Sequence, residues 1–193
     1  ILLLGREGQI GHCLSSKLQK TQNTVIYSSK SDLDIANLRQ TKEYILNLQP
    51  DVIINAIAYT AVDLAEENKV DVDLVNNIAV KNIAEACKQI NCLLVHFSSD
   101  YIFDGLSKSP YSENANTNPL SIYGKSKLDS EISIKESSCR FLIIRTGWVY
   151  SEFGNNFVRS MLKLAEKNKE LNIVNDQFGC PTYAQDIAKS TLI

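Results

Sequence analysis

Six continuous apolar runs of strand length recur along the chain, and they limit its fold more than any other feature. Because the runs do not alternate with polar residues, they are typical of strands buried on both faces of a sheet. Segments with helical spacing lie between most of them, which predicts a parallel sheet covered on both sides, a doubly wound α/β fold of the Rossmann type. The apolar runs cover residues 1–5, 24–28, 51–58, 92–97, 141–146 and 171–174.

Five segments carry the spacing of amphipathic helices. They are residues 10–20, 37–49, 73–90, 121–135 and 155–169. In the third segment, one stripe is expected to face the core; it consists of Val75, Ile78, Ala79, Ile83 and Ala86. The stretch 104–120 is rich in Ser, Asn and Pro and predicts a long surface loop, of a kind that is often functional.

Charge and cysteine content exclude several classes of protein. The 193 residues carry a formal charge of −2 and no basic stripe, which argues against nucleic acid or an anionic membrane as a partner. No apolar run reaches the length of a membrane span. The five cysteines are odd in number and form no CxxC pair, so neither a disulfide framework nor a zinc site is indicated. We expect buried thiols in the reducing cytoplasm and no metal site.

A glycine-rich turn follows the first strand. The motif GREGQIG places Gly5, Gly8 and Gly11 between an apolar strand and a helix. One glycine permits the tight turn, one lets the backbone approach a pyrophosphate, and one allows helix and strand to pack closely. The start of the helix adds free N–H groups and a positive dipole end. The motif predicts dinucleotide binding, although its spacing is GxxGxxG rather than GxGxxG; an ordinary strand–helix turn is the alternative.

The end of the second strand bears on the choice of dinucleotide. NAD-specific proteins usually carry an acid there, which holds the ribose 2′-hydroxyl. This strand ends in VIYSSK, with Ser28, Ser29 and Lys30, and Arg6 lies in the glycine loop. Hydroxyl and cationic partners suit a 2′-phosphate, so we expect NADPH as the cofactor, with NADH as the alternative. No acid occupies the expected place; Asp32 and Asp34 come a little later, where an adenine ring would be contacted.

Tyr123 and Lys127 are four residues apart in a helical segment and therefore share a face. A phenol with its ordinary pKa of about 10 is a poor acid–base group at neutral pH, and a nearby ammonium is expected to lower that pKa. The pair would then donate and recover a proton near neutral pH. A core tyrosine beside a solvated lysine is the simpler alternative.

The glycine loop, a strand ending in Ser98 and Ser99, and the YxxxK pair follow one another in a fixed order. This ordered set resembles the extended branch of the short-chain dehydrogenase/reductase superfamily. There, a hydroxyl holds the substrate carbonyl, tyrosine supplies the proton, and lysine tunes the tyrosine. Five longer blocks resemble the dTDP-4-dehydrorhamnose reductase family more closely: PDVIINAIAYTAVDLAEE, HFSSDYIFDG, NPLSIYGKSKLDSE, RTGWVYSEFGNNFV and VNDQFGCPTYAQDIA.

The resemblance implies an enzyme that reduces the 4-keto group of dTDP-4-dehydro-6-deoxy-L-mannose to dTDP-L-rhamnose with NADPH. It implies that Ser99, Tyr123 and Lys127 are catalytic and that the last two also contact the cofactor. The nucleotide sugar would be bound by Ser99, Asp100, Tyr101 and Trp148. Together with Arg6, the other expected cofactor contacts are Gly5, Gly8, Gln9, Ile10, Gly11, Asp34, Ile35, Ala56, Ala58, Tyr59 and Thr60.

The resemblance also implies two parts. Residues 1–150 are expected to form the NAD(P)-binding domain, and residues 151–193 to begin a substrate-binding lobe that is largely missing from this chain. Three positions depart from the family pattern. Ser99 replaces threonine and keeps the hydroxyl, Ile57 replaces alanine and is expected to crowd the cofactor, and Gly147 replaces serine and removes a hydroxyl near the nicotinamide.

Two other functions stay open on the sequence alone. The first is another nucleotide-sugar enzyme of the extended branch, such as an epimerase or dehydratase; dehydratases have glutamate where this chain has Tyr101, which argues against water loss. The second is a non-catalytic NAD(P)-binding regulatory subunit, against which the Tyr123–Lys127 pair argues. His12 and His96 have no spaced partners, and His96 is expected to pack within its strand. The expected partner is a small nucleotide sugar, and a homodimer is among the expected assemblies.

Overall fold

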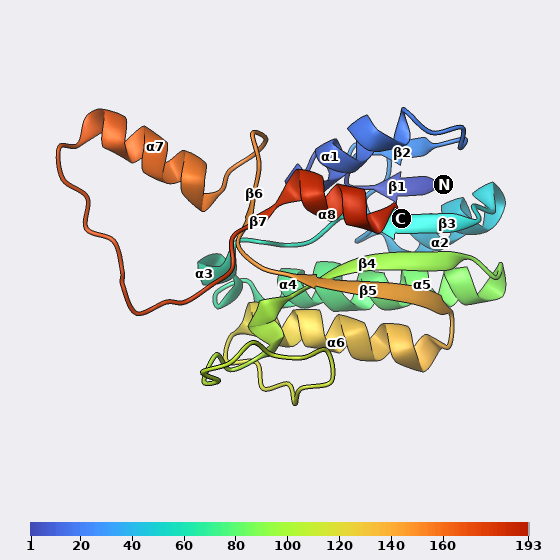
Figure 1. Cartoon of the computed structure of the whole chain (residues 1–193). Helices are drawn as coiled ribbons and strands as arrows, with labels where there is room; N and C mark the ends of the chain where they lie inside the picture. Colours follow the sequence, from blue (N-terminus) through green and yellow to red (C-terminus); the bar gives the residue numbers. More distant parts are fainter. Residues whose placement is uncertain (193) are drawn as a thin grey trace.

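Five parallel strands form the central sheet of the computed structural model, which describes residues 1–192 (Figure 1). The strands are β1 Leu2–Leu4, β2 Ile26–Ser28, β3 Val52–Asn55, β4 Leu93–Ser99 and β5 Arg140–Thr146. Their order is β2-β1-β3-β4-β5, and every neighbouring pair is parallel. The order reverses at β1, because β2 lies on one side of it and β3 on the other. The predicted doubly wound fold is confirmed, and such folds bind ligands at this reversal, beyond the carboxyl ends of the strands.

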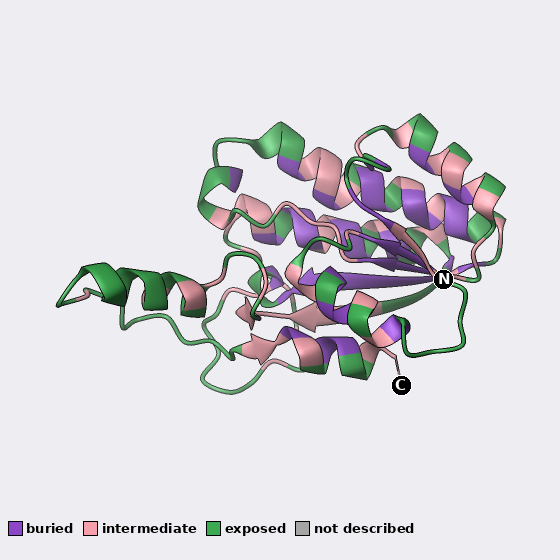
Figure 2. Ribbon diagram, turned by 90° about the horizontal axis from the view of Figure 1, so that it is seen from above, coloured by how far each residue is buried: buried purple, intermediate pink, exposed green. Residues whose placement is uncertain are grey.

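Helices cover both faces of the sheet. They are α1 Gln9–Leu18, α2 Leu38–Leu48, α5 Ala79–Gln89, α6 Ile122–Ser137 and α8 Ala184–Thr191. Leu3 of β1 packs with apolar side chains of α1 and α8, whereas Leu2 and Leu4 belong to a second cluster with side chains of α2, α5 and α6. Strands β1, β3 and β4 are largely buried between these two layers (Figure 2). The edge strand β5 is not, since Phe141 and Leu142 are 41% and 46% exposed. The apolar runs of β1, β3 and β4 are continuous because these strands bury both of their faces, whereas the same prediction for residues 141–146 is wrong.

The helix predicted at residues 73–90 is interrupted. A π-turn, Leu74–Ile78, joins α4 (Lys69–Asp73) to α5. The wider turn changes the direction of the side chains around it relative to a regular helix. The prediction for Ile78 is therefore wrong, since this side chain is 39% exposed, and Asn76 is buried instead.

Two predicted strand segments differ in the structure. Residues 171–174 form no strand, and the side chains of Ile173 and Val174 are exposed. Residues 56–58 leave the sheet after Asn55, where they line a cavity. A small separate sheet forms between β6 (Val149–Tyr150) and β7 (Thr182–Tyr183).

The remaining elements lie at the periphery. Helix α7, Phe157–Lys167, has no buried residue and projects from the body of the molecule (Figures 1 and 2). The short elements are α3 Val62–Ala65 and a 3₁₀ turn at Asp100–Ile102. Among the helices of residues 1–192, none is both long and apolar enough to traverse a bilayer.

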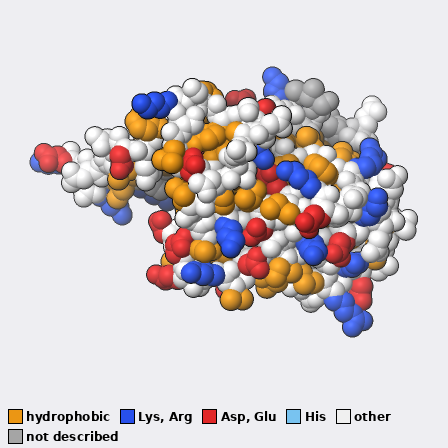
Figure 3. All heavy atoms as spheres, turned by 90° about the horizontal axis from the view of Figure 1, so that it is seen from below, with side chains coloured by type: hydrophobic (Ala, Val, Ile, Leu, Met, Phe, Trp, Pro, Cys, Tyr) orange, Lys and Arg blue, Asp and Glu red, His pale blue; other side chains and the backbone are white. Residues whose placement is uncertain are grey.

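The predicted surface loop at residues 104–120 is irregular in the structure, as expected. Tyr111 anchors it, because its hydroxyl donates to Asp104 (2.7 Å) and its ring stacks on Phe103 at 4.3 Å. On the face of the molecule seen in Figure 3, acidic and basic side chains are interspersed. The five cysteines are free thiols; four are buried, as predicted, whereas the prediction is wrong for Cys180, which is exposed.

Candidate functional site

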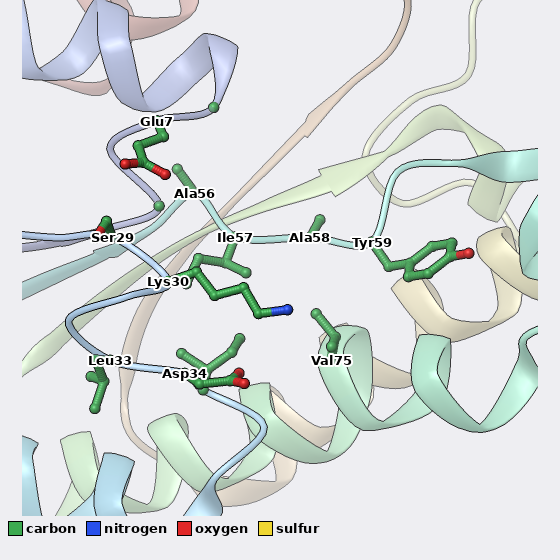
Figure 4. A pocket seen from close by; sticks show the side chains of 13 residues that line it. Glu7, Ser29, Lys30, Leu33, Asp34, Ala56, Ile57, Ala58, Tyr59 and Val75 are labelled. Carbon is green, nitrogen blue, oxygen red and sulfur yellow. The ribbon is translucent and has the colours of Figure 1, made fainter. Parts of the chain in front are cut away.

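Two adjoining cavities lie beyond the carboxyl ends of the central strands. They share four lining residues, Gly8, Ala56, Ile57 and Ala58. The first, of about 310 Å³, is further lined by Gly5, Glu7, Ser29, Lys30, Leu33, Asp34, Ile35, Tyr59 and Val75 (Figure 4). The second, of about 570 Å³, includes Gln9, Ile10, Thr60, Ser99, Asp100, Tyr101, Tyr123, Lys127 and Trp148. Of the residues predicted from the sequence, Arg6 and Gly11 line neither cavity.

The three glycines of the loop have different physical roles. Gly5 has a φ of +81°, and a Cβ there would lie 2.8 Å from the side chain of Ile57. A Cβ on Gly11 would lie 2.0 Å from the carbonyl oxygen of Gly5, so this glycine lets α1 pack against the loop. A Cβ on Gly8 would meet nothing closer than 3.5 Å and would project at the junction of the two cavities. The fold therefore requires Gly5 and Gly11, whereas Gly8 keeps space open for a ligand.

Matched alanine substitutions should separate these roles. Gly11→Ala forces a methyl group into a backbone oxygen and is expected to lower the free energy of unfolding by about 1–3 kcal/mol, as overpacking does. Gly8→Ala is expected to leave that free energy unchanged within about 0.5 kcal/mol. Urea unfolding followed by circular dichroism measures both values. Equal destabilisation by the two substitutions would contradict the assignment.

The side chain of Gln9 forms hydrogen bonds with a segment that is distant in the sequence. Its Oε1 accepts hydrogen bonds from Ser151 Oγ and Asn156 Nδ2, both at 2.9 Å. Its Nε2 donates to the carbonyl oxygens of Val149 and Asn155, both at 3.4 Å. The predicted pyrophosphate contact of Gln9 would therefore come from its backbone N–H. The backbone N–H groups at the start of α1 remain available. The first intrahelical bond runs from the N–H of His12 to the carbonyl of Gly8, so the N–H groups before His12 have no partner within the helix.

The acid nearest to the end of β2 is Asp32. Asp32 accepts from the backbone N–H of Ser29 (2.8 Å) and from its hydroxyl (2.7 Å), and these bonds lower the pKa of Asp32. The carboxylate of Asp32 is thus occupied by Ser29, and Asp32 lines neither cavity. Arg6 lies over the ring of Tyr27 at 5.6 Å, outside the cavity. Lys30 and Asp34 extend into the first cavity, which Glu7 also lines, so that one cation and two carboxylates lie around it (Figure 4).

The end of β4 delivers polar groups to the second cavity. The hydroxyl of Ser99 donates to Asp100 (3.1 Å) and accepts from the N–H of Tyr101 (3.2 Å), which caps the 3₁₀ turn. Burial raises the pKa of Asp100. A Cβ on Gly147 would lie 2.1 Å from a carboxylate oxygen of Asp100. The glycine at this position therefore makes room for the carboxylate, beyond removing a hydroxyl. Beside it, Trp148 has a φ of +49° and lines the cavity.

Tyr123 and Lys127 reach the same cavity from the first turns of α6. The helix is capped by Ser121, whose hydroxyl accepts from the N–H of Gly124 (3.0 Å). Burial raises the pKa of Tyr123 by more than the nearby Ser99 hydroxyl lowers it. The expectation of a lowered phenol pKa is therefore wrong for this structure, and the phenol is held protonated. Lys127 is fully buried and donates to the carbonyl oxygen of Phe97 (2.6 Å); burial lowers its pKa from 10.5 to about 8.

Buried polar side chains that the sequence argument missed hold this arrangement. Asn76, in the π-turn, accepts from Tyr59 N–H (2.8 Å) and donates to its carbonyl (3.1 Å) and to Ser126 (3.0 Å). It thereby ties the cavity wall after β3 to α6. The two carboxylate oxygens of Glu131, on α6, accept from Nε and Nη2 of Arg145 at 2.9 and 2.7 Å. In the sequence, the one feature that could have identified Asn76 is its place as a polar residue within an otherwise apolar helical stripe.

Comparisons with known proteins agree with this geometry. A sequence model described as the RmlD substrate binding domain matches residues 1–193. A dTDP-4-dehydrorhamnose reductase of Salmonella typhimurium is 40% identical over 99% of this chain and 65% of its own length. The crystal structure of a dTDP-4-dehydrorhamnose reductase from Clostridium acetobutylicum superposes with a TM-score of 0.96 at 38% identity, covering 99% of this chain and 68% of that one.

A second solved structure carries a ligand. It is a dTDP-4-dehydrorhamnose reductase from Bacillus anthracis in complex with NADP, with a TM-score of 0.95 and 35% identity over 99% of this chain and 68% of that chain. The chain spans about 65% of the length of the curated relatives it matches. By sequence over its whole length and by structure, the chain belongs to the RmlD substrate binding domain family.

Proposed function

We propose that this protein reduces the 4-keto group of dTDP-4-dehydro-6-deoxy-L-mannose with NADPH, which yields dTDP-L-rhamnose. One observation carries the proposal: Ser99, Tyr123 and Lys127 line a cavity that adjoins the glycine loop. A hydroxyl, a protonated phenol and an ammonium beside a dinucleotide-type loop suit carbonyl reduction. The relatives named above as dTDP-4-dehydrorhamnose reductases support the choice of substrate.

The residues present fit a dinucleotide. Gly8 leaves open space where the two cavities meet, and the start of α1 offers N–H groups from Gln9, Ile10 and Gly11 to a pyrophosphate. Asp34 and Ile35 would meet the adenine in the first cavity, with Ala56, Ala58 and Tyr59 along its wall. Lys30, the one cation among the described lining residues of that cavity, suits a 2′-phosphate better than Arg6 does. These features favour NADPH, with NADH as the alternative.

The chain's own groups divide the reaction among them. The Ser99 hydroxyl is proposed to hold the sugar carbonyl oxygen, and the Tyr123 hydroxyl to give it a proton. The raised pKa of Tyr123 suits this direction, because the phenol carries its proton through the neutral range. Lys127 places a positive charge beside the oxygen that loses the proton. Asp100, Tyr101 and Trp148 would contact the nucleotide sugar. The dinucleotide, when bound, supplies the hydride.

Residues 1–150 are proposed to form the cofactor domain, with residues 151–193 beginning the substrate side. Gln9 links the two parts through its bonds to residues 149–156. The free thiols suit a reducing compartment, which supports the cytoplasm as the place of action. A homodimer stays a prediction, which light scattering of the purified protein would test.

Two measurements test the proposal. Fluorescence titration with NADPH should show saturable binding, which Gly8→Ala should weaken although it spares the fold. Addition of the 4-keto sugar nucleotide should then oxidise NADPH, followed as loss of the absorbance of the reduced nicotinamide. The same keto sugar on a UDP carrier serves as the specificity control. Binding of NADPH without any oxidation would count against a reductase and in favour of a regulatory NADPH-binding protein.

A further inference from the structure

His96 is a fully buried imidazole directly behind Lys127, and none of the proposed chemical steps uses it. It lies on β4, three residues before Ser99. Its Nε2 lies 3.2 Å from the hydroxyl of Ser130 and 3.4 Å from the ammonium of Lys127. Its Nδ1 lies 3.3 Å from Nδ2 of Asn55. Each ring nitrogen therefore has a polar neighbour, and the neighbours decide where the ring proton resides.

Asn55 fixes the tautomer of His96. The Oδ1 of Asn55 accepts from the backbone N–H of Ile57 (3.1 Å), so the amide group of Asn55 turns its N–H toward His96. Nδ1 of His96 must then act as an acceptor. A neutral imidazole carries a single N–H, which is consequently on Nε2. Burial and the neighbouring ammonium both lower the pKa of His96, so the ring stays neutral.

The Nε2–H group continues a directed chain of hydrogen bonds. It donates to Ser130 Oγ, and the Ser130 hydroxyl in turn donates to the carbonyl oxygen of Lys127 (2.6 Å). The chain thus runs from β3 through β4 to the backbone of α6. In this tautomer His96 presents a donor, not an acceptor, to the ammonium of Lys127. The ammonium has three donors, and the carbonyl of Phe97 takes one at 2.6 Å.

We propose that His96 is a positioning residue: its Nε2-protonated ring offers Lys127 no acceptor, so the ammonium keeps its bond to the carbonyl of Phe97 and directs its remaining N–H groups toward the cavity. The alternative tautomer would accept from Lys127 and draw the ammonium inward. The role of Lys127 in turnover rests on the proposed function, but its position and titration do not. The groups that face Lys127 are Glu131 on its own helix and His96 on β4, with Tyr123 and Asp100 in the shared cavity.

Nitrogen-15 spectra of the imidazoles test the tautomer directly. The chain has two histidines, and a His12→Gln variant identifies the signals of His96. At neutral pH, His96 is expected to show a protonated Nε2 and an unprotonated Nδ1. A protonated Nδ1, or a doubly protonated ring, would overturn the inference.

His96→Asn tests the positioning. The asparagine oxygen can still accept from Asn55, whereas the Nε2–H group that bonds Ser130 beside Lys127 is lost and the space admits water. The pKa of Lys127, followed by the carbon-13 shift of its Cε, is expected to rise by about one unit. In an active protein, kcat should fall roughly 10- to 100-fold with KM little changed, and the alkaline limb of the pH–rate profile should move with the pKa of Lys127.

Two serine variants on α6 complete the experiment. Ser130→Ala removes the acceptor of the Nε2–H group and should shift the pKa of Lys127 in the same direction by less. The hydroxyl of Ser133 donates to Asn77 instead, so Ser133→Ala should leave the pKa of Lys127 unchanged. An unchanged Lys127 resonance in both His96→Asn and Ser130→Ala would refute the positioning role. If the unaltered protein has no turnover, the proposed function fails, and the Lys127 resonance still decides this inference.

Discussion

Tyr123→Phe is expected to lower turnover by about 10²- to 10⁴-fold, because it removes the proton donor and keeps the ring. The phenyl ring keeps the edge-on contact with Tyr101, whose ring centroid lies 5.7 Å away. The affinity for NADPH should stay within about threefold of the original value, since the substitution acts on the transition state rather than on ground-state binding. Steady-state kinetics and fluorescence titration measure the two quantities.

A second tyrosine provides the control for this substitution. Tyr44 of α2 packs against the core away from both cavities, so Tyr44→Phe should preserve turnover. Full activity of Tyr123→Phe would show that another group donates the proton. A parallel loss of NADPH binding would instead assign Tyr123 a structural role. The comparison separates a catalyst from a binding subunit, which sequence resemblance alone does not do.

The sequence predicted most of the residues that line the two cavities, because parallel strands end on one edge of a sheet. Gly5 follows β1 and Ser99 ends β4, so the fold class alone brings them to the same edge. Helical spacing likewise placed Tyr123 and Lys127 on one face of α6. These predictions depend on local periodicity and on one topological rule. Neither requires knowledge of which distant side chains touch.

The features that the sequence did not predict depend on hydrogen bonds and burial in the completed fold. The partners of Gln9 lie more than 130 residues away, at positions 149–156, and no spacing rule connects them. Asp32 turns back onto Ser29 through an irregular segment that strand propensity does not describe. The apolar stretch at residues 171–174 finds no neighbouring strand to pair with. A raised pKa for Tyr123 follows from burial, which depends on the completed fold.

Lys127→Met is expected to remove turnover and, at neutral pH, to stabilise the fold. The drop in the pKa of Lys127 from 10.5 to about 8 corresponds to a cost of about 3 kcal/mol for keeping the buried ammonium charged. Methionine has a similar length and carries no charge, although it leaves the carbonyl of Phe97 without this donor. We therefore expect the free energy of unfolding to rise by about 1–2 kcal/mol.

The stability gained by Lys127→Met is expected to depend on pH, because the pKa of Lys127 differs between the folded and the unfolded chain. Below pH 8, Lys127 is charged in both the folded and the unfolded chain, so the whole cost of burial is present. Between about 8 and 10.5 the unfolded chain binds more protons than the folded one, and the stability of the unaltered protein rises with pH. The advantage of Lys127→Met should accordingly be constant below pH 8 and fade toward pH 10.5. Urea unfolding of both proteins across this range measures the difference.

An exposed lysine on the same helix supplies the control. Lys125→Met removes a charge from the surface of α6 and should change the free energy of unfolding by less than about 0.5 kcal/mol at every pH. If Lys127→Met were destabilising below pH 8, the bond to Phe97 would outweigh the desolvation of the ammonium, and Lys127 would be a structural anchor. A gain in stability together with lost turnover would show that the fold retains a costly buried charge because the chemistry at Tyr123 requires it.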